Sequence, residues 1–262
     1  MEARVSSHST VDNLLCQRIQ EEQLVWKQIL RRLLDVTLFL AERGLAFRGS
    51  SCLVGDPSNG NFLGLLELLG RYDPLLAEHL AKVKDSQKEK RRMQVHYLSS
   101  QSQNEFIECC ASKVTDVILN ERAESKYYSI IVDATPDSSH VEQTVFILRY
   151  VHLDSDTNAY NVQERFLKFV DCNNKTGEDI ATMILETLNE NNIPIGDCRG
   201  QGYDNVSNMS GKYNGAQAHV LRQCPIATCS PCACHSLNLR GVHAAETCST
   251  VDTFFWSCAQ II

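Results

Sequence analysis

The chain has 262 residues, of which 43% are hydrophobic and 22% are charged, so it is long and apolar enough for one large or two ordinary globular domains. No apolar run approaches the ~18 residues of a membrane span, and no N-terminal stretch fits a secretory signal, so we expect neither membrane insertion nor secretion. The net charge of −7 falls in residues 123–262, which carry 9 basic and 16 acidic side chains. A strong nucleic-acid binder usually shows the opposite balance, whereas an acidic half suits a carboxylate site completed by metal.

The 12 cysteines indicate a reducing compartment. Without a visible secretory signal, the default for cysteines is the free thiol and not a disulfide framework. We therefore expect a protein of the cell interior.

Apolar periodicity predicts an all-helical region over residues 1–124. Residues 11–43 carry apolar side chains at three- and four-residue steps, and residues 61–83 resume the pattern after a loop. Asp73, followed by proline, is typical of a helix start. A further amphipathic helix is predicted over residues 102–124, with a core face of Phe106, Ile107, Val114, Val117, Ile118 and Leu119.

The basic run KDSQKEKRR, residues 84–92, has two interpretations. A solvated helix end or loop is the simpler one, because such runs usually form exposed surface. Contact with a phosphate backbone, or nuclear targeting, is the alternative.

From residue 125 the pattern changes to strands alternating with helices. The predicted elements are strands over residues 127–133, 143–152 and 160–171, a helix over 176–192, a strand within 193–204, a loop and helix over 205–221, a strand over 225–229 and a helix over 232–245. The short linkers between the first three strands favour an antiparallel meander. The order over residues 125–245 is therefore β-β-β-α-β-α-β-α, and the fold class is α/β (α+β).

That element order resembles the opening of the ribonuclease-H-like fold. The resemblance implies a mixed sheet in which the first and fourth strands lie side by side, with carboxylates on the first strand and at the end of the fourth. Asp133 and Asp204 occupy those positions in this sequence. By spacing alone the two residues are unremarkable, because aspartate is common in turns.

Three motifs carry a closer resemblance: SIIVDATPDSSHVEQ, GYDNVSNMSGKYNGAQAHV and CACHSLNL. They resemble the transposase domain of the hAT (hobo–Activator) superfamily, nearest its zinc finger MYM-type-like branch, and the likeness extends from about residue 20. It implies a nuclear protein in which Asp133 and Asp204 are two acids of a DDE-type site that holds Mg²⁺ or Mn²⁺. It also implies that Cys232 and His235, the C-x-x-H motif, engage DNA or order the site.

The sequence departs from that family at the third acid. The family places a glutamate beyond a long helical insertion, whereas Glu246 is the only glutamate after the C-x-x-H motif and comes too early. Residues 246–262 match only the start of the insertion. We therefore expect an incomplete catalytic core without DNA cleavage or strand transfer.

Other side chains invite alternative chemistry. Cys229 and Cys232 have the step of a zinc knuckle, but structural zinc sites draw on two separated ligand pairs, so zinc is not expected. A nucleophilic cysteine beside His235 lacks an orienting acid. Asp137 has metal-binding chemistry, although capping a turn is its simpler role.

Two functional hypotheses stay open. The first is a domesticated or degenerate hAT-type transposase fragment whose ancestral metal-dependent DNA cleavage is lost. The second is a non-catalytic scaffold, associated with DNA or with protein partners, in the nucleus or otherwise in the cytoplasm. Metal titration of variants at Asp133 and Asp204 separates the two hypotheses.

Overall fold

The computed structural model describes residues 9–91, 93, 95–136, 142–171 and 176–246. Asp137 and most of residues 246–262 therefore lie outside the described residues. The chain divides into two compact units, Met1–Val114 and Thr115–Ile262, called here the N-terminal and C-terminal units. Among the helices that the structure describes, none combines the length and apolarity needed to cross a bilayer.

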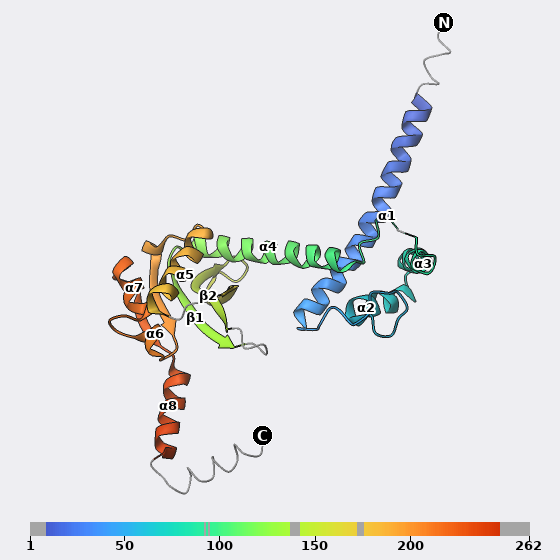
Figure 1. The fold of residues 1–262 in the computed structure, drawn as a ribbon. Coiled ribbons are helices and arrows are strands. Elements are labelled where there is room, and N and C mark those ends of the chain that lie inside the picture. The colour runs from blue at the N-terminus through green and yellow to red at the C-terminus, as the bar shows by residue number, and fades with distance from the viewer. Residues whose placement is uncertain (1–8, 92, 94, 137–141, 172–175, 247–262) are drawn as a thin grey trace. The chain divides into compact units, whose positions relative to one another are not determined.

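The N-terminal unit is helical, as predicted (Figure 1). It contains α1 (Ser9–Glu42), α2 (Gly60–Gly70), α3 (Pro74–Lys88) and the first part of α4 (Ser100–Ser125). Asp73 caps α3 as expected, because its side chain accepts hydrogen bonds from the backbone N–H groups of Leu75 and Leu76. The core of this unit consists of Ile29, Leu33, Val36, Leu40, Val54, Phe62, Leu63, Leu66, Leu76, Leu80, Val83 and Leu98.

The helix predicted over residues 11–43 is confirmed as α1, whereas the core face predicted over residues 102–124 is only partly right. Leu14, Leu15 and Ile19 continue the apolar pattern of α1 but are exposed. On α4, Ile118 is buried as predicted, whereas Ile107, Val114 and Val117 are exposed. Apolar periodicity identifies the face of a helix that can be covered, but it does not show whether another element covers it along the whole length.

The C-terminal unit is built on one mixed sheet in the order β3-β2-β1-β4-β5. β1 pairs antiparallel with β2 and parallel with β4. The predicted meander and the predicted neighbourhood of the first and fourth strands are thus confirmed. The elements are β1 (Tyr128–Pro136), β2 (Glu142–Asp154), β3 (Ala159–Asp171), α5 (Gly177–Glu190), η1 (Ile195–Asp197), β4 (Cys198–Tyr203), α6 (Ser207–Ser210), α7 (Ala216–Gln223), β5 (Thr228–Pro231) and α8 (Ala233–Glu246).

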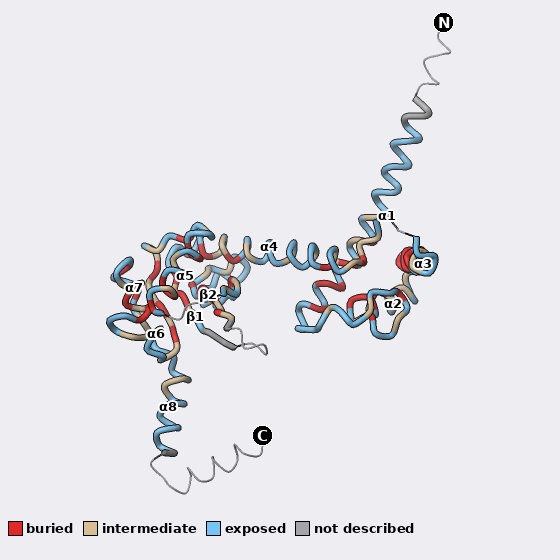
Figure 2. The backbone as a smooth tube through the Cα atoms, viewed as in Figure 1, coloured by how far each residue is buried: buried red, intermediate tan, exposed pale blue. Residues whose placement is uncertain are grey.

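One face of the sheet, the core face, is buried beneath helices (Figure 2). Successive side chains of a strand point to opposite faces, so Tyr128, Ile130 and Val132 of β1 share this face. Thr176 starts α5 as predicted by accepting a hydrogen bond from the backbone of Asp179. Further residues of this core include Phe146, Leu148 and Tyr150 of β2, Ile180, Ile184 and Leu188 of α5, and Ala216 and Val220 of α7.

The opposite face, the open face, begins on β1 with Ser129, Ile131 and Asp133, which are half-buried or exposed. The register of β1 with β2, and of β2 with β3, shows which residues of β2 and β3 share this face. The exposed side chains there include Arg149, Val151 and Leu153 of β2, and Tyr160, Val162, Phe166 and Phe169 of β3.

Candidate functional site

The two predicted carboxylates lie at the same end of neighbouring parallel strands. The register of β1 with β4 ends at the pair Ile131 and Gly202. Asp133 and Asp204 each follow two positions later, 131 + 2 and 202 + 2. Because parallel strands run in the same direction, this equal offset brings the two acids to one edge of the sheet.

Hydrogen bonds on the core face fix β4, and with it the position of Asp204. The buried Gln201 donates from Nε2 to the carbonyl oxygen of Ala227 at 2.8 Å. The hydroxyl of Tyr203 donates to Oε1 of Gln201 at 2.8 Å. Both polar side chains are therefore satisfied inside the core, and satisfied buried polar groups hold a unique geometry.

Two glycines leave the open face of β4 without side chains that would project into the cleft. A Cβ atom at Gly200 would lie 2.7 Å from Oγ of Ser129, closer than real contacts allow. At Gly202 a Cβ atom would meet Cγ1 of Ile131 at an ordinary 3.5 Å. Only glycine fits at position 200 without displacement of its neighbour, and the two glycines leave an unobstructed floor beside Asp133 and Asp204.

The C-x-x-H segment is tied to the end of β4. The backbone N–H of Cys232 donates to the carbonyl oxygen of Tyr203 at 3.0 Å. The side-chain amide of Asn205 donates to Oγ of Ser236 at 2.8 Å, and that hydroxyl donates to the carbonyl oxygen of Cys232 at 2.9 Å. These bonds connect the start of α8 to the residues beside Asp204.

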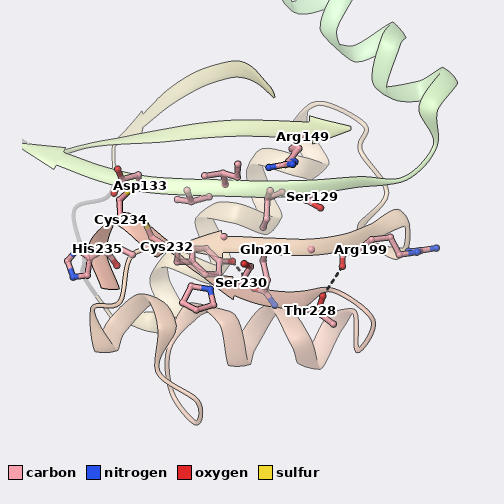
Figure 3. A pocket seen from close by; sticks show the side chains of 18 of the residues that line it. Ser129, Asp133, Arg149, Arg199, Gln201, Thr228, Ser230, Cys232, Cys234 and His235 are labelled. Atoms are coloured by element: carbon pink, nitrogen blue, oxygen red, sulfur yellow. Dashed lines mark hydrogen bonds between the residues drawn. The ribbon is translucent and has the colours of Figure 1, made fainter. Parts of the chain in front are cut away.

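A cleft of 860 Å³ on the open face gathers all four predicted site residues. Asp133, Asp204, Cys232 and His235 line it together with Cys234. In Figure 3, Asp133 lies at the same end of the cleft as the two labelled cysteines and His235. The sequence prediction thus selected residues that the fold brings together.

The opposite end of the cleft carries hydroxyls and arginines that sequence reasoning missed. Ser129, Arg149, Arg199 and Thr228 line it (Figure 3). The alternation of β1 could have indicated Ser129, which shares a face with Asp133. Arg149 comes from another strand, so only the pairing register reveals its position.

The two arginines differ in their partners. The guanidinium of Arg199 stacks over the ring of Tyr127 with its Cζ 4.1 Å from the centroid, and it donates to the carbonyl oxygens of Gly196 and Cys198. Arg149 donates from a guanidinium nitrogen to Oε1 of Glu164 at 2.8 Å.

The cleft supplies some, but not all, of the ligands that Mg²⁺ or Mn²⁺ needs. Carboxylate oxygens are the ligands these ions prefer, and Asp133 and Asp204 supply them in one cleft. One oxygen of Asp204 also accepts a hydrogen bond from the backbone of Val206 at 3.2 Å. Within the described residues, no group of three or more His, Cys, Asp or Glu side chains is placed to hold a metal ion. A metal bound by these two acids would therefore take its remaining ligands from water or a substrate.

The cysteines of this region are divided between the two faces. Cys224 is buried, and burial raises the pKa of the half-buried Cys229, which packs against the core. Cys232 and Cys234 are exposed in the cleft. The two cysteines of the C-x-x-C step thus have different surroundings.

Comparison with known proteins identifies the fold. Residues 2–215 match the family described as "ZMYM1/FAM200, RNase-like domain". The chain is 28% identical over 176 residues to the mouse "52 kDa repressor of the inhibitor of the protein kinase", and 28% identical over 179 residues to the human protein of the same name. Each match covers 63% of this chain and 22% of the relative, so the chain spans about a fifth of the length of these curated relatives.

Proposed function

The chain belongs to the ZMYM1/FAM200 RNase-like domain family, and we propose that its cleft is the remnant of a hAT-type transposase site. In this proposal Asp133 and Asp204 retain a weak Mg²⁺ or Mn²⁺ site, whereas DNA cleavage and strand transfer are lost. The observation that carries it is the equal offset of the two acids beyond the pair Ile131 and Gly202, in one cleft.

The chain's own residues support a positioning role for this site. Asp133 and Asp204 would hold the ion, and a bound divalent ion would activate water and stabilise charge on a phosphoryl group. Cys232 orders the site through its backbone bond to Tyr203. His235 lines the cleft beside it, where its ring can contact a bound phosphate or base.

The proposed loss of catalysis is tied to the acids that the structure describes in the cleft. Among the cleft-lining residues that the structure describes, Asp133 and Asp204 are the carboxylates. Two carboxylates leave a divalent ion with few protein ligands, which favours weak binding.

Manganese titration tests the retained site. We expect calorimetry or Mn²⁺ electron paramagnetic resonance to show weak binding to the full chain, and loss of that binding in both Asp133→Asn and Asp204→Asn. Asp156→Asn, which removes the same charge from an exposed turn, is the matched control and should bind as the wild type does. Absence of Mn²⁺ binding to the wild type, or binding that both site variants preserve, would refute the metal site.

A non-catalytic scaffold is the second candidate, favoured by the apolar side chains on the open face. Val162, Phe166 and Phe169 are exposed there, and exposed apolar surface is typical of association sites. The two relatives are named as repressors of an inhibitor of a protein kinase, and a regulatory protein of that kind can act as a scaffold without catalysis. This function predicts that Phe169→Gln changes association in sedimentation experiments while Asp133→Asn does not.

A further inference from the structure

A row of residues crosses the open face at the end of the cleft remote from the acids. Arg149 on β2 pairs with Ser129 on β1, Ser129 pairs with Gly200 on β4, and Gly200 pairs with Thr228 on β5. All four residues line the cleft. Ser129 precedes Asp133 by four positions on the same strand, a distance of about 13 Å along β1.

The chemistry of this row suits a phosphate group. Arg149 offers a planar guanidinium and Ser129 offers a hydroxyl donor on one side of Gly200. On the other side, the hydroxyl of Thr228 donates to the carbonyl oxygen of Arg199 at 3.3 Å and would exchange that bond for a phosphate oxygen. Arginine recognises phosphate by paired, charge-assisted hydrogen bonds. Gly200 leaves the space between the two hydroxyls without a side chain, so an anion can approach the sheet closely.

Arg149 is available for such a contact because its present partner holds it weakly. Its ion pair with Glu164 is 2.8 Å long, and both side chains are 52% exposed. Exposed ion pairs contribute little, because water and salt screen them. A phosphate carrying a full negative charge can therefore replace Glu164, whereas Arg199 is already engaged by Tyr127 and two backbone carbonyls.

We infer that Arg149, Ser129 and Thr228 form a subsite for one backbone phosphate of a nucleic-acid strand lying along the cleft. Glu164 competes with the phosphate for Arg149, because its carboxylate pairs with the Arg149 guanidinium in the structure. The subsite reads the backbone and not the bases, because it offers donors suited to phosphate oxygens. The inference rests on the proposed function for the direction of the strand, which runs from this row toward Asp133 and Asp204.

The competing ion pair predicts opposite effects for its two members. In fluorescence anisotropy with a labelled single-stranded oligodeoxynucleotide, Arg149→Gln should weaken binding roughly three- to tenfold, since it removes one charge-assisted contact. For Arg149→Gln, the slope of log binding constant against log salt concentration should be smaller in magnitude than the wild-type slope by about 0.7. That difference is the value for one phosphate contact on a single strand. Glu164→Gln should instead tighten binding. EDTA in the buffer removes any contribution from divalent metal.

A second ion pair of the same unit supplies matched controls. Lys168 and Glu190 are 2.6 Å apart on β3 and α5, and neither lines the cleft. Lys168→Gln and Glu190→Gln make the same charge changes and should leave affinity and salt slope near the wild-type values. The subsite is refuted if Arg149→Gln binds with wild-type affinity and slope, or if each cleft variant only matches its control of equal charge.

Two further measurements show which proposal is wrong if a result differs from the expectation. If inorganic phosphate binds the wild type but the oligonucleotide does not, the strand inference is wrong. Mn²⁺ titration is independent of this assay, so lost metal binding with intact effects at Arg149 overturns the proposed function alone. Intact Mn²⁺ binding without any effect at Arg149 overturns only the subsite.

Discussion

The two faces of the sheet that the structure describes in the C-terminal unit differ in their exposure. Phe146 on the core face is 0% exposed, whereas Phe166 and Phe169 on the open face are 47% and 57% exposed. Beneath the sheet Tyr203 donates to Gln201, and Gln201 donates to the carbonyl oxygen of Ala227. Asp133 and Arg149 line the cleft on the other face. Alternate residues of the same strands therefore lie in the core or line the cleft.

Paired substitutions at aromatic residues test this division and have the largest expected effect. Phe146→Ala should lower the free energy of unfolding by about 3–5 kcal/mol, because it removes a fully buried ring. Phe169→Ala should cost about 1 kcal/mol or less, since its side chain is 57% exposed and its ring contacts the exposed Phe166, with ring centroids 4.8 Å apart. Denaturant unfolding followed by circular dichroism measures both. Equal costs would show that the open face is covered in solution.

The same division explains what the sequence could predict. The apolar run before Asp133 indicates a buried strand, and the element order resembles a fold in which the first and fourth strands are neighbours, so Asp133 and Asp204 could be placed together in advance. The C-x-x-H motif was predicted beside them from the resemblance alone. The backbone bond of Cys232 to Tyr203 gives that placement its physical basis.

The rest depended on pairing that a sequence does not display. Arg149 faces Ser129 only because β1 and β2 pair in one particular register, and a shift by one residue would turn it to the other face. Val114 and Val117 looked like core because periodicity marks an apolar stripe, yet no described partner buries them. Long-range coverage, and not local pattern, decides both cases.

Alkaline pH should weaken the core face selectively. Burial raises the pKa of Cys198 to about 11, and it raises the pKa values of Tyr128 and Tyr203 above their usual range. The unfolded chain loses these protons first, so stability is complete below pH ~9 and falls as the pH rises through the folded pKa of Cys198. For Cys198 the loss is about 2–3 kcal/mol. Denaturant unfolding between pH 7.5 and 10.5 measures it.

Single cysteine variants test whether the Cys198 thiol causes that pH dependence. Cys198→Ala removes the buried thiol and should make the decline between pH 9 and 10.5 shallower. Cys234→Ala removes an exposed thiol of the cleft and should leave the decline as steep as in the wild type. If both variants give the same slope as the wild type, the buried thiol does not control alkaline stability.

Thiol reactivity gives the finest comparison of the two faces and the smallest effect on stability. Iodoacetamide, followed by mass spectrometry of the native chain, should modify the exposed Cys232 and Cys234 well before the buried Cys198 and Cys224. Burial raises the pKa of Cys198 and lowers its thiolate fraction, so restricted access and weak ionisation act together. Modification of the cleft thiols should leave the unfolding free energy unchanged but obstruct oligonucleotide binding, because both line the cleft. Equal native rates at Cys198 and Cys232 would mean that the core face opens more readily than its complete burial implies, and would remove the basis for assigning stability to that face.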